Sequence, residues 1–165
     1  MRGLTCEDVS GGVGLRVTVP VTMGPDEAAR ELAPRLSALA GERATASSHG
    51  ESARASHGVP VVTIDGYSGS GKSTLAAALA RRGGRASSYE AWDWEAGATG
   101  ETTRVPLAPT IIEGCGTIEA EADLAIWIAD PGEEERRHRA LARDGQTYAP
   151  HWWRWADQDL GRSIH

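Results

Sequence analysis

The chain has 165 residues, of which 40% are hydrophobic, and it carries a formal net charge of −6. A chain of this length is typical of one domain and can bury a core. The acidic balance argues against broad binding to nucleic acid or to an anionic membrane surface, because both require a basic face. The cysteines, Cys6 and Cys115, are too few for a disulfide framework, and no apolar run reaches the ~18 residues of a membrane span. We therefore expect a cytoplasmic protein without a signal peptide, a nucleic-acid partner or a membrane partner.

The first part of the chain predicts one short strand and one helix. Residues 16–19, Arg-Val-Thr-Val, favour a strand, and Pro20 should confine it to the edge of a sheet because proline has no N–H to donate. An apolar stripe over residues 26–40 predicts a helix that begins at a proline and two acidic residues, and Pro34 should kink or break this helix. Residues 41–57 are rich in Ser, Ala, Gly and His without periodicity, which is typical of a linker or a disordered loop.

A strand, a glycine-rich loop and a helix are then expected in direct succession. Residues 59–64 form an apolar β-branched run, typical of a buried parallel strand, and we place this strand at the centre of a sheet. Residues 73–82 predict a helix that ends in two arginines and stops at a pair of glycines. The loop between them fits the phosphate-binding pattern G-x-x-x-x-G-K-[ST] at every fixed position, and this order of elements is the context that the pattern needs. The predicted nucleotide-binding residues are Gly66, Tyr67, Ser68, Gly69, Ser70, Gly71, Lys72, Ser73 and Thr74.

The lysine of this loop is the only lysine in the chain, although Lys and Arg together number 17. An ammonium on a thin stem can lie between the β- and γ-phosphates of a nucleotide, whereas a planar guanidinium would not fit the same space. The glycines let the backbone approach the phosphates, so that the loop amides and the helix N-terminus face the anion. We therefore predict that the loop binds ATP, with Lys72 between the β- and γ-phosphates and Ser73 on Mg²⁺. The alternative is a glycine-rich turn that binds no ligand.

Two more strands and two helices are expected after the loop helix. Residues 110–112 and 124–129 are short apolar runs typical of buried strands. Residues 133–143 predict a helix that is acidic at its start and basic at its end, which suits the helix dipole, and residues 150–160 predict a last helix. Residues 84–108 mix aromatic, small and acidic residues without a clear period, so we expect a loop there.

A second acidic group is needed to hold Mg²⁺ or its waters, and two candidates follow predicted strands. Glu113 comes directly after the strand at 110–112, and Asp130 comes directly after the strand at 124–129. Ligands bind at the carboxyl ends of the strands in open α/β sheets, so either carboxylate is in a suitable place. Each of them could instead cap a loop. Asp65, which borders the phosphate-binding loop, could cap or help to order the site.

Arginines crowd the predicted helix at 133–143, at positions Arg136, Arg137, Arg139 and Arg143. Bases near a triphosphate stabilise the charge that develops on the phosphoryl oxygens during transfer. Arg139 and Arg143 share a helix face at i, i+4, so we favour them as the functional pair. We expect Arg136 and Arg137 to be solvated and to pair with the glutamates at the start of the helix.

Several segments resemble the uridine kinase-like branch of the small P-loop kinases. These are residues 64–76, which contain the loop, residues 111–114, which read Ile-Ile-Glu-Gly, and residues 139–145. The chain is also similar to actinobacterial ATP-binding proteins of the P-loop NTPase superfamily that are described as uridine kinase-like. The resemblance covers about residues 59–160, and the phosphate-binding loop is its most specific part.

This resemblance implies a P-loop NTPase-type fold, with three α/β/α layers around a small parallel sheet and helices on both faces. It also implies a lid that carries Arg139 and Arg143, and it places Glu113 near the metal and the substrate. In relatives, a second strand soon after the loop helix ends in paired aspartates, one of which activates the acceptor hydroxyl. No such strand is evident here, where only Asp93 could stand in as the base, and relatives add a further strand where this chain stops at His165. We therefore expect a shortened member with an incomplete sheet.

These patterns predict two parts, an N-terminal tail with one helix and a flexible linker at residues 1–57, and a nucleotide-binding domain at residues 58–165. The predicted function is transfer of the γ-phosphoryl group of ATP to a small hydroxylated acceptor such as a nucleoside. The alternative is a non-catalytic ATP-binding module or a slow NTPase that has lost the acceptor base. The predicted catalytic residues are Lys72, Glu113, Arg139 and Arg143, and the predicted Mg²⁺ ligands are Ser73 and Glu113. The acceptor, the choice between ATP and GTP and the oligomeric state stay open.

Overall fold

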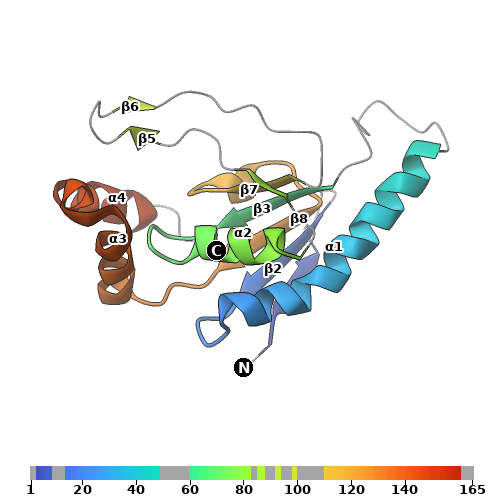
Figure 1. Cartoon of the computed structure of the whole chain (residues 1–165), viewed down its shortest axis with the longest axis horizontal. Helices are drawn as coiled ribbons and strands as arrows, with labels where there is room; N and C mark the ends of the chain where they lie inside the picture. The colour runs from blue at the N-terminus through green and yellow to red at the C-terminus, as the bar shows by residue number, and fades with distance from the viewer. Residues whose placement is uncertain are drawn as a thin grey trace.

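The fold is α/β, with a mixed and mostly parallel sheet (Figure 1). The computed structural model describes residues 3–8, 14–48, 60–82, 85–87, 92–93, 98–99 and 110–160. Within these residues the main sheet has the strand order β1-β2-β8-β3-β7-β4, and β5 pairs with β6 in a separate small sheet. The strand bounds are Thr5–Asp8 (β1), Leu15–Val19 (β2), Val61–Asp65 (β3), Arg85–Ser87 (β4), Trp92–Asp93 (β5), Ala98–Thr99 (β6), Thr110–Glu113 (β7) and Leu124–Ile128 (β8).

Helices make up most of the remaining described chain. The α-helices are α1 (Pro25–Ser48), α2 (Lys72–Ala80), α3 (Glu133–Tyr148) and α4 (Trp152–Leu160), and the short 3-10 helices are η1 (Thr117–Glu119) and η2 (Ala149–His151). Among the described segments, no helix combines the length and the apolar character that crossing a bilayer requires.

β3 lies at the centre of the main sheet, between β8 and β7, as its apolar sequence predicts. Both neighbours run parallel to it, and Val62 is level with Ile111 of β7 and with Leu124 of β8. All three of these side chains are buried, as expected for parallel strands that are covered by helices. Because β3, β7 and β8 point the same way, the segments that follow them meet at one edge of the sheet, and the candidate site lies there.

The N-terminal segment is part of this main sheet. β2 pairs in parallel with β8 and in antiparallel with β1, so it is an interior strand and not the edge strand that we expected. Pro20 follows the last residue of β2 and therefore interrupts none of its pairing. Val17 and Val19 are buried in the same core as Ile64 of β3. The predicted tail at residues 1–57 is thus corrected: its apolar strand and helix complete the core of the rest of the chain.

α1 continues through Pro34 to Ser48, whereas we expected a kink or break at the proline and a linker before Ser48. The ring of Pro34 is exposed, while Ala29 and Leu32 are fully buried. Burial of this apolar face stabilises the helix enough to offset the backbone hydrogen bond that the proline cannot make. The last part of the predicted linker, residues 49–57, lies outside the described residues.

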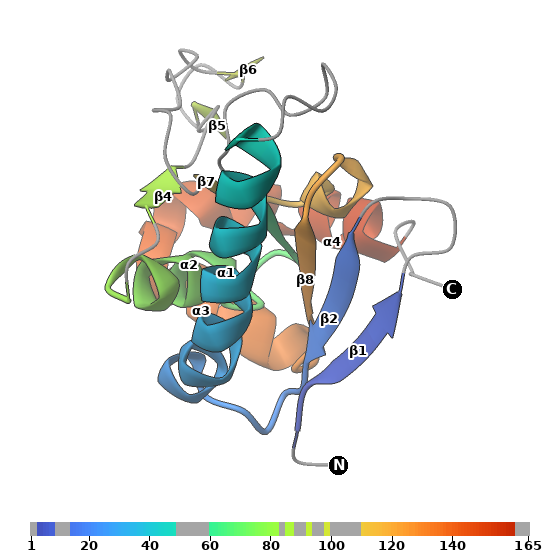
Figure 2. The ribbon, with the colours of Figure 1, turned by 90° about the vertical axis from the view of Figure 1, so that its right-hand side faces the viewer.

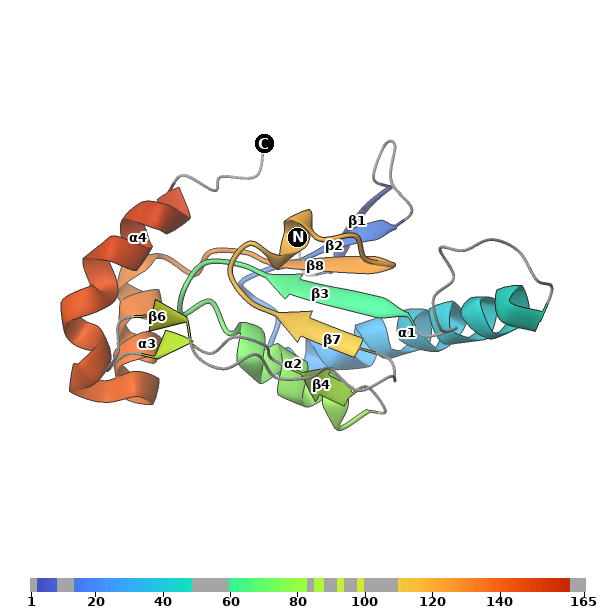
Figure 3. The ribbon, with the colours of Figure 1, turned by 90° about the horizontal axis from the view of Figure 1, so that it is seen from above.

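The helices occupy one face and one end of the sheet (Figures 2 and 3). Leu32 of α1 and Leu79 of α2 are buried in one cluster with Ile126 of the sheet. α3 and α4 lie beyond the carboxyl ends of the strands and form a second cluster around Tyr148 and Trp152. We expected helices on both faces. Among the described residues, the apolar faces of α3 and α4 instead contact each other, and these two helices lie beyond the end of the sheet.

β4 is a strand that we did not expect after the loop helix. It pairs in parallel with β7 at the edge of the main sheet, and its Ala86 is level with Ile111. The sequence Arg-Ala-Ser contains no apolar run, so its periodicity could not reveal it. Residues 88–91, which follow β4, lie outside the described residues.

A matched pair of valine substitutions tests whether the N-terminal strand belongs to the core. Val17 in β2 has no exposed surface, whereas 54% of Val21 is exposed. We expect Val17→Ala to lower the free energy of unfolding by about 2 kcal/mol, because it removes buried methyl groups and leaves a cavity. Val21→Ala should change the free energy by less than about 0.5 kcal/mol, as is usual at the surface. Urea denaturation of both variants measures this, and equal, negligible changes would show that β2 is not part of the core.

Candidate functional site

The predicted phosphate-binding loop connects β3 to α2 at the carboxyl edge of the sheet. Gly66, Gly69 and Gly71 all have a positive φ (151°, 78° and 106°), a range that favours glycine. These dihedrals reverse the chain within the loop, and Ser70 N–H donates to the carbonyl of Tyr67 at 3.0 Å. Gly71 directly precedes the first turn of α2, where backbone N–H groups have no partner within the helix. The predicted succession of strand, loop and helix is thus confirmed, and a helix N-terminus of this kind favours a nearby anion.

Lys72 is folded back into the loop, with only 9% of its surface exposed. Its ammonium donates to the carbonyls of Gly66 at 2.8 Å and of Tyr67 at 3.0 Å, and it lies 3.2 Å from Sγ of Cys115. Cys115 forms no disulfide. The loop therefore encloses the lysine charge, and neutral carbonyls are its partners here. Such partners bind an ammonium more weakly than phosphate oxygens do.

Ser73 and Glu113 lie together at the start of α2, as the predicted metal site requires. Ser73 Oγ donates to Glu113 Oε1 at 2.8 Å. Glu113 ends β7, where it is level with Ile64 of the neighbouring β3, and this register brings its carboxylate beside the loop. Asp130, the other candidate, accepts from Gly132 N–H at 2.8 Å and pairs with an arginine of α3. The structure therefore places Glu113 at the loop, whereas Asp130 caps the turn before α3.

Asp65 orders the two loops that form the site. Its buried carboxylate accepts hydrogen bonds from three backbone N–H groups, those of Gly66 at 2.6 Å, Gly116 at 3.0 Å and Ile118 at 2.9 Å. Backbone N–H groups stabilise a buried carboxylate without a second charged side chain. Asp65 thus connects the phosphate-binding loop to the segment after β7, which carries Cys115 and follows Glu113. This is the ordering role that the sequence left open for it.

Of the two favoured arginines of α3, Arg139 approaches the loop. Arg139 is exposed and pairs with Glu135 at 2.6 Å, and its Nη1 lies 3.9 Å from the position that a Cβ on Gly71 would take. Arg143 donates two hydrogen bonds to Asp144, at 2.8 and 2.6 Å. The hydrogen bonds that Arg143 donates to Asp144 raise the pKa of its guanidinium, and the negative charge of Glu113 raises it further. The guanidinium of Arg143 therefore stays charged.

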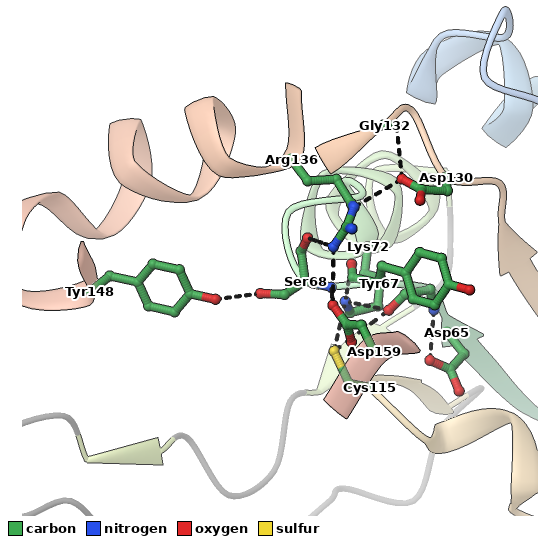
Figure 4. Close-up of polar contacts among 11 residues, drawn as sticks. Asp65, Tyr67, Ser68, Lys72, Cys115, Asp130, Gly132, Arg136, Tyr148 and Asp159 are labelled. Carbon is green, nitrogen blue, oxygen red and sulfur yellow. Dashed lines mark hydrogen bonds and ion pairs between the residues drawn. The ribbon is translucent and has the colours of Figure 1, made fainter. Parts of the chain in front are cut away.

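Arg136 was assigned wrongly from the sequence. We expected it to be solvated, but only 4% of it is exposed. Its Nε lies 2.9 Å from Asp130 Oδ1 and its Nη1 lies 3.2 Å from Asp159 Oδ2 of α4 (Figure 4). Arg137, the other arginine expected to be solvated, is exposed as predicted.

Asp159 is a second residue at the loop that we did not predict. Its carboxylate accepts a hydrogen bond from the Ser68 N–H at 2.7 Å. A signal for it was present, because Asp159 lies three residues after Ala156 and seven after Trp152, on the apolar face of the last helix. A charged residue on an apolar face indicates a buried and paired group. Arg136 shows the same signal, since it lies four residues before the buried Ala140.

The hydroxyls of Ser68 and Tyr148 share a hydrogen bond of 2.6 Å. Tyr148 is buried where α3 meets η2, and burial raises the pKa of its phenol, although the hydrogen bond to Ser68 opposes this shift. The phenol is therefore neutral at neutral pH and binds Ser68 as a polar group without charge. Asp93, the predicted substitute base, lies in β5 of the small second sheet, and its side chain is outside the described part of the chain.

The candidate site combines the Lys72 ammonium, the Ser73 hydroxyl, the Glu113 carboxylate and the Arg139 guanidinium around the N-terminus of α2. No group of three or more His, Cys, Asp or Glu side chains that could hold a metal ion occurs in the described residues. A magnesium ion here would therefore use few protein ligands, as is usual for Mg²⁺ that is bound together with phosphates. Comparison with protein-family models, with curated proteins and with solved structures finds no match to this chain.

The packing of Gly69 provides a test of the loop geometry. A side chain there would collide with the backbone carbonyl of Arg136, whereas one at Gly71 would meet nothing closer than an ordinary contact. Both glycines have a positive φ, so alanine is strained at either position. We expect Gly69→Ala to lower the free energy of unfolding by about 1–3 kcal/mol more than Gly71→Ala does, because only Gly69→Ala overpacks a backbone contact. Chemical denaturation of the two variants measures the difference, and equal losses would contradict the contact with α3.

Proposed function

We propose that this chain binds ATP with Mg²⁺ at the loop between β3 and α2 and transfers the γ-phosphoryl group to a small hydroxylated acceptor such as a nucleoside. The observation that carries the proposal is the convergence of the Lys72 ammonium, the Ser73–Glu113 pair and Arg139 on the N-terminus of α2. These groups have the chemistry that phosphoryl transfer uses: fixed positive charge, oxygen ligands for a hard cation and backbone amides.

The proposed fold is of the P-loop NTPase type. The loop follows the central strand of a sheet in which β2, β8, β3, β7 and β4 run parallel, and it enters the helix that packs beside that strand. This arrangement and the resemblance to uridine kinase-like proteins support the proposal together. We expected β2 only as an edge strand and did not expect β4, and both enlarge the small parallel sheet of the prediction. The incomplete sheet of a shortened member is therefore not part of the proposal.

Nucleotide binding requires an exchange of partners at Lys72. In this structure the ammonium donates to the carbonyls of Gly66 and Tyr67. A charged phosphate oxygen is a stronger partner than a neutral carbonyl, so a triphosphate in the loop can replace at least one of these contacts. The side chain of Lys72 is almost buried, which limits the screening of this interaction by water.

The residues present fit a magnesium ion bound together with a triphosphate. Ser73 Oγ and Glu113 Oε1, 2.8 Å apart, are both hard oxygen ligands at the open end of the loop. Mg²⁺ keeps several water or phosphate ligands, so Ser73 could bind it directly and Glu113 could bind it directly or through a water. When bound, the ion would neutralise charge on the phosphates.

Arg139 and Arg143 are proposed to contact the transferring group. They now pair with Glu135 and Asp144, and both arginines are exposed, so these ion pairs contribute little to stability. Exchange of these carboxylates for phosphate oxygens therefore costs little. The arginines would then lie where negative charge develops on the phosphoryl oxygens.

One observation favours the alternative, a non-catalytic ATP-binding module or a slow NTPase. The described carboxylates nearest to the loop are all bound to protein groups: Asp65 to backbone amides, Asp130 and Asp159 to Arg136, and Glu113 to Ser73. A general base must have a free lone pair within hydrogen-bond distance of the acceptor hydroxyl. The single hydrogen bond from Ser73 leaves lone pairs on the Glu113 carboxylate, but the proposal already assigns this residue to the metal ion.

Incubation with ATP, Mg²⁺ and a panel of nucleosides tests the proposal. Labelled nucleotide product supports transfer, release of phosphate alone supports a hydrolase, and binding without turnover supports the module.

We expect Lys72→Ala to weaken ATP binding about 100-fold or more, because it removes two charge-assisted contacts of about 1.5–3 kcal/mol each. Arg82→Ala, which removes an exposed cation just after α2, is the control and should bind ATP as the unmodified protein does. Calorimetric titration measures the affinities, and equal binding by Lys72→Ala would remove the loop as the site.

A second prediction concerns the metal. Glu113→Gln should reduce the gain in ATP affinity that Mg²⁺ provides, by about tenfold, while leaving the metal-free affinity nearly unchanged, because an amide is a weaker ligand for Mg²⁺ than a carboxylate. Glu119→Gln makes the same change at an exposed position in η1 and serves as the control. Titration of ATP at several Mg²⁺ concentrations gives the result. An unaltered Mg²⁺ dependence in Glu113→Gln would exclude this glutamate from the metal site.

A further inference from the structure

The polar groups of Ser68 are bound by α3 and α4. Its N–H donates to Asp159 Oδ2 at 2.7 Å, its carbonyl accepts from Arg136 Nη1 at 3.5 Å, and its hydroxyl shares a hydrogen bond with Tyr148 at 2.6 Å (Figure 4). The bond to Asp159 is short because the acceptor is charged. The peptide groups on either side of Ser68 thus contact the ion pair between Arg136 and Asp159. Neither peptide group can rotate without breaking its hydrogen bond to this pair.

The residues on either side of Ser68 contact the same helix. The guanidinium of Arg136 lies 5.0 Å from the centre of the Tyr67 ring, within the range of a cation–π interaction. At Gly69 the absence of a side chain allows the loop backbone to approach the carbonyl of Arg136. Three consecutive loop residues are therefore attached to α3 and α4, whereas the next part of the loop, from Gly71, continues into α2.

Arg136 and Asp159 form a buried ion pair with a second, more open carboxylate beside it. Asp159 is 2% exposed, and the side chain of Asp130, which also pairs with Arg136, is 36% exposed. A buried ion pair adds little stability compared with an apolar pair of the same size, but loss of one partner is costly because the other charge stays buried. Such a pair is therefore better suited to fixing a geometry than to raising stability.

We propose that Asp159 is a positioning residue of the phosphate-binding loop. Together with Arg136, it fixes the two peptide groups of Ser68. The position of Ser68 determines the direction of the backbone that follows. The amides of Gly71 and of the first turn of α2 are thereby oriented toward the phosphates. The ligand in this inference rests on the proposed function, whereas the attachment of the loop does not. The loop is thereby coupled to the α3–α4 pair: when α4 shifts, the first half of the loop shifts with it.

Asp159→Asn tests this directly, with Asp157→Asn at an exposed position of the same helix as the matched control. We expect Asp159→Asn to weaken ATP affinity about tenfold in fully folded protein, the effect of losing one hydrogen bond to a charged group. Asp157→Asn should leave the affinity unchanged. A purely structural role would lower the urea midpoint of Asp159→Asn and leave its ATP affinity intact, and that result would overturn the proposal.

A double variant guards against simple unfolding. Arg136→Met combined with Asp159→Leu replaces the buried ion pair by apolar groups, a change that folded proteins commonly tolerate. It should fold and should bind ATP about tenfold or more weakly, because Ser68 N–H loses its charged acceptor. Unchanged ATP affinity in this folded variant would also overturn the proposal.

Amide hydrogen exchange separates this inference from the proposed function. If the unmodified protein binds no ATP, the proposed function fails, and exchange at Ser68 still reports on the attachment. We expect slow exchange of the Ser68 N–H in the unmodified protein and in Asp157→Asn, and at least about tenfold faster exchange in the double variant, because exchange rates follow local opening. Equal exchange in all three proteins would contradict the role of Asp159.

Discussion

The carboxylate of Asp65 joins the two strand ends on which the candidate site is built. It accepts from the N–H of Gly66 at the start of the phosphate-binding loop and from Gly116 and Ile118 after β7. A buried charge needs such partners, because its desolvation is otherwise costly. These hydrogen bonds hold Gly66, which follows β3, and the segment after β7 in fixed positions relative to each other. The contact between Ser73 and Glu113, where we propose that a metal ion binds, follows from this arrangement.

The described residues form two packed apolar clusters, and the loop connects them. One cluster lies between the sheet and the helices α1 and α2, and the other lies between α3 and α4. Ser68, bound to Arg136 and Asp159, is attached to the second cluster, and Lys72 begins a helix of the first. A ligand in the loop would therefore contact groups from both clusters. The distance between Arg139 and Gly71 depends on the relative position of α2 and α3, because Arg139 lies in α3 and Gly71 directly precedes α2.

The N-terminal segment adds an interior strand and a packed helix to the main sheet. β2 lies in parallel beside β8, and α1 packs with α2 on the same face. The sheet therefore gains a buried strand from a part of the chain that comes before the loop. A nucleotide site needs a rigid base, because misplacement of its groups weakens every contact with the phosphates. The buried residues of β2 and α1 support β8 and β3 and so contribute to that base from a distance.

Local patterns in the sequence determined the loop and the strands β3, β7 and β8 around it. They also led to the roles that we propose for Lys72, Ser73 and Glu113. Strand and helix periodicity and the glycine spacing act over a few residues, so they can be read without knowing the fold. They also showed that Arg139 and Arg143 share a helix face.

What only the tertiary structure decided is which of these faces is buried and what it meets. Periodicity could not show that Pro34 lies on an exposed face, that β2 is an interior strand, or that Glu113 and not Asp130 reaches the loop. Ser68 and Asp159 are 91 residues apart in the sequence, and their contact exists because α4 packs across the end of the sheet. Burial and charge pairing between distant segments depend on the whole chain, and for that reason the partners of Arg136 and Asp159 could be known only once the fold was seen.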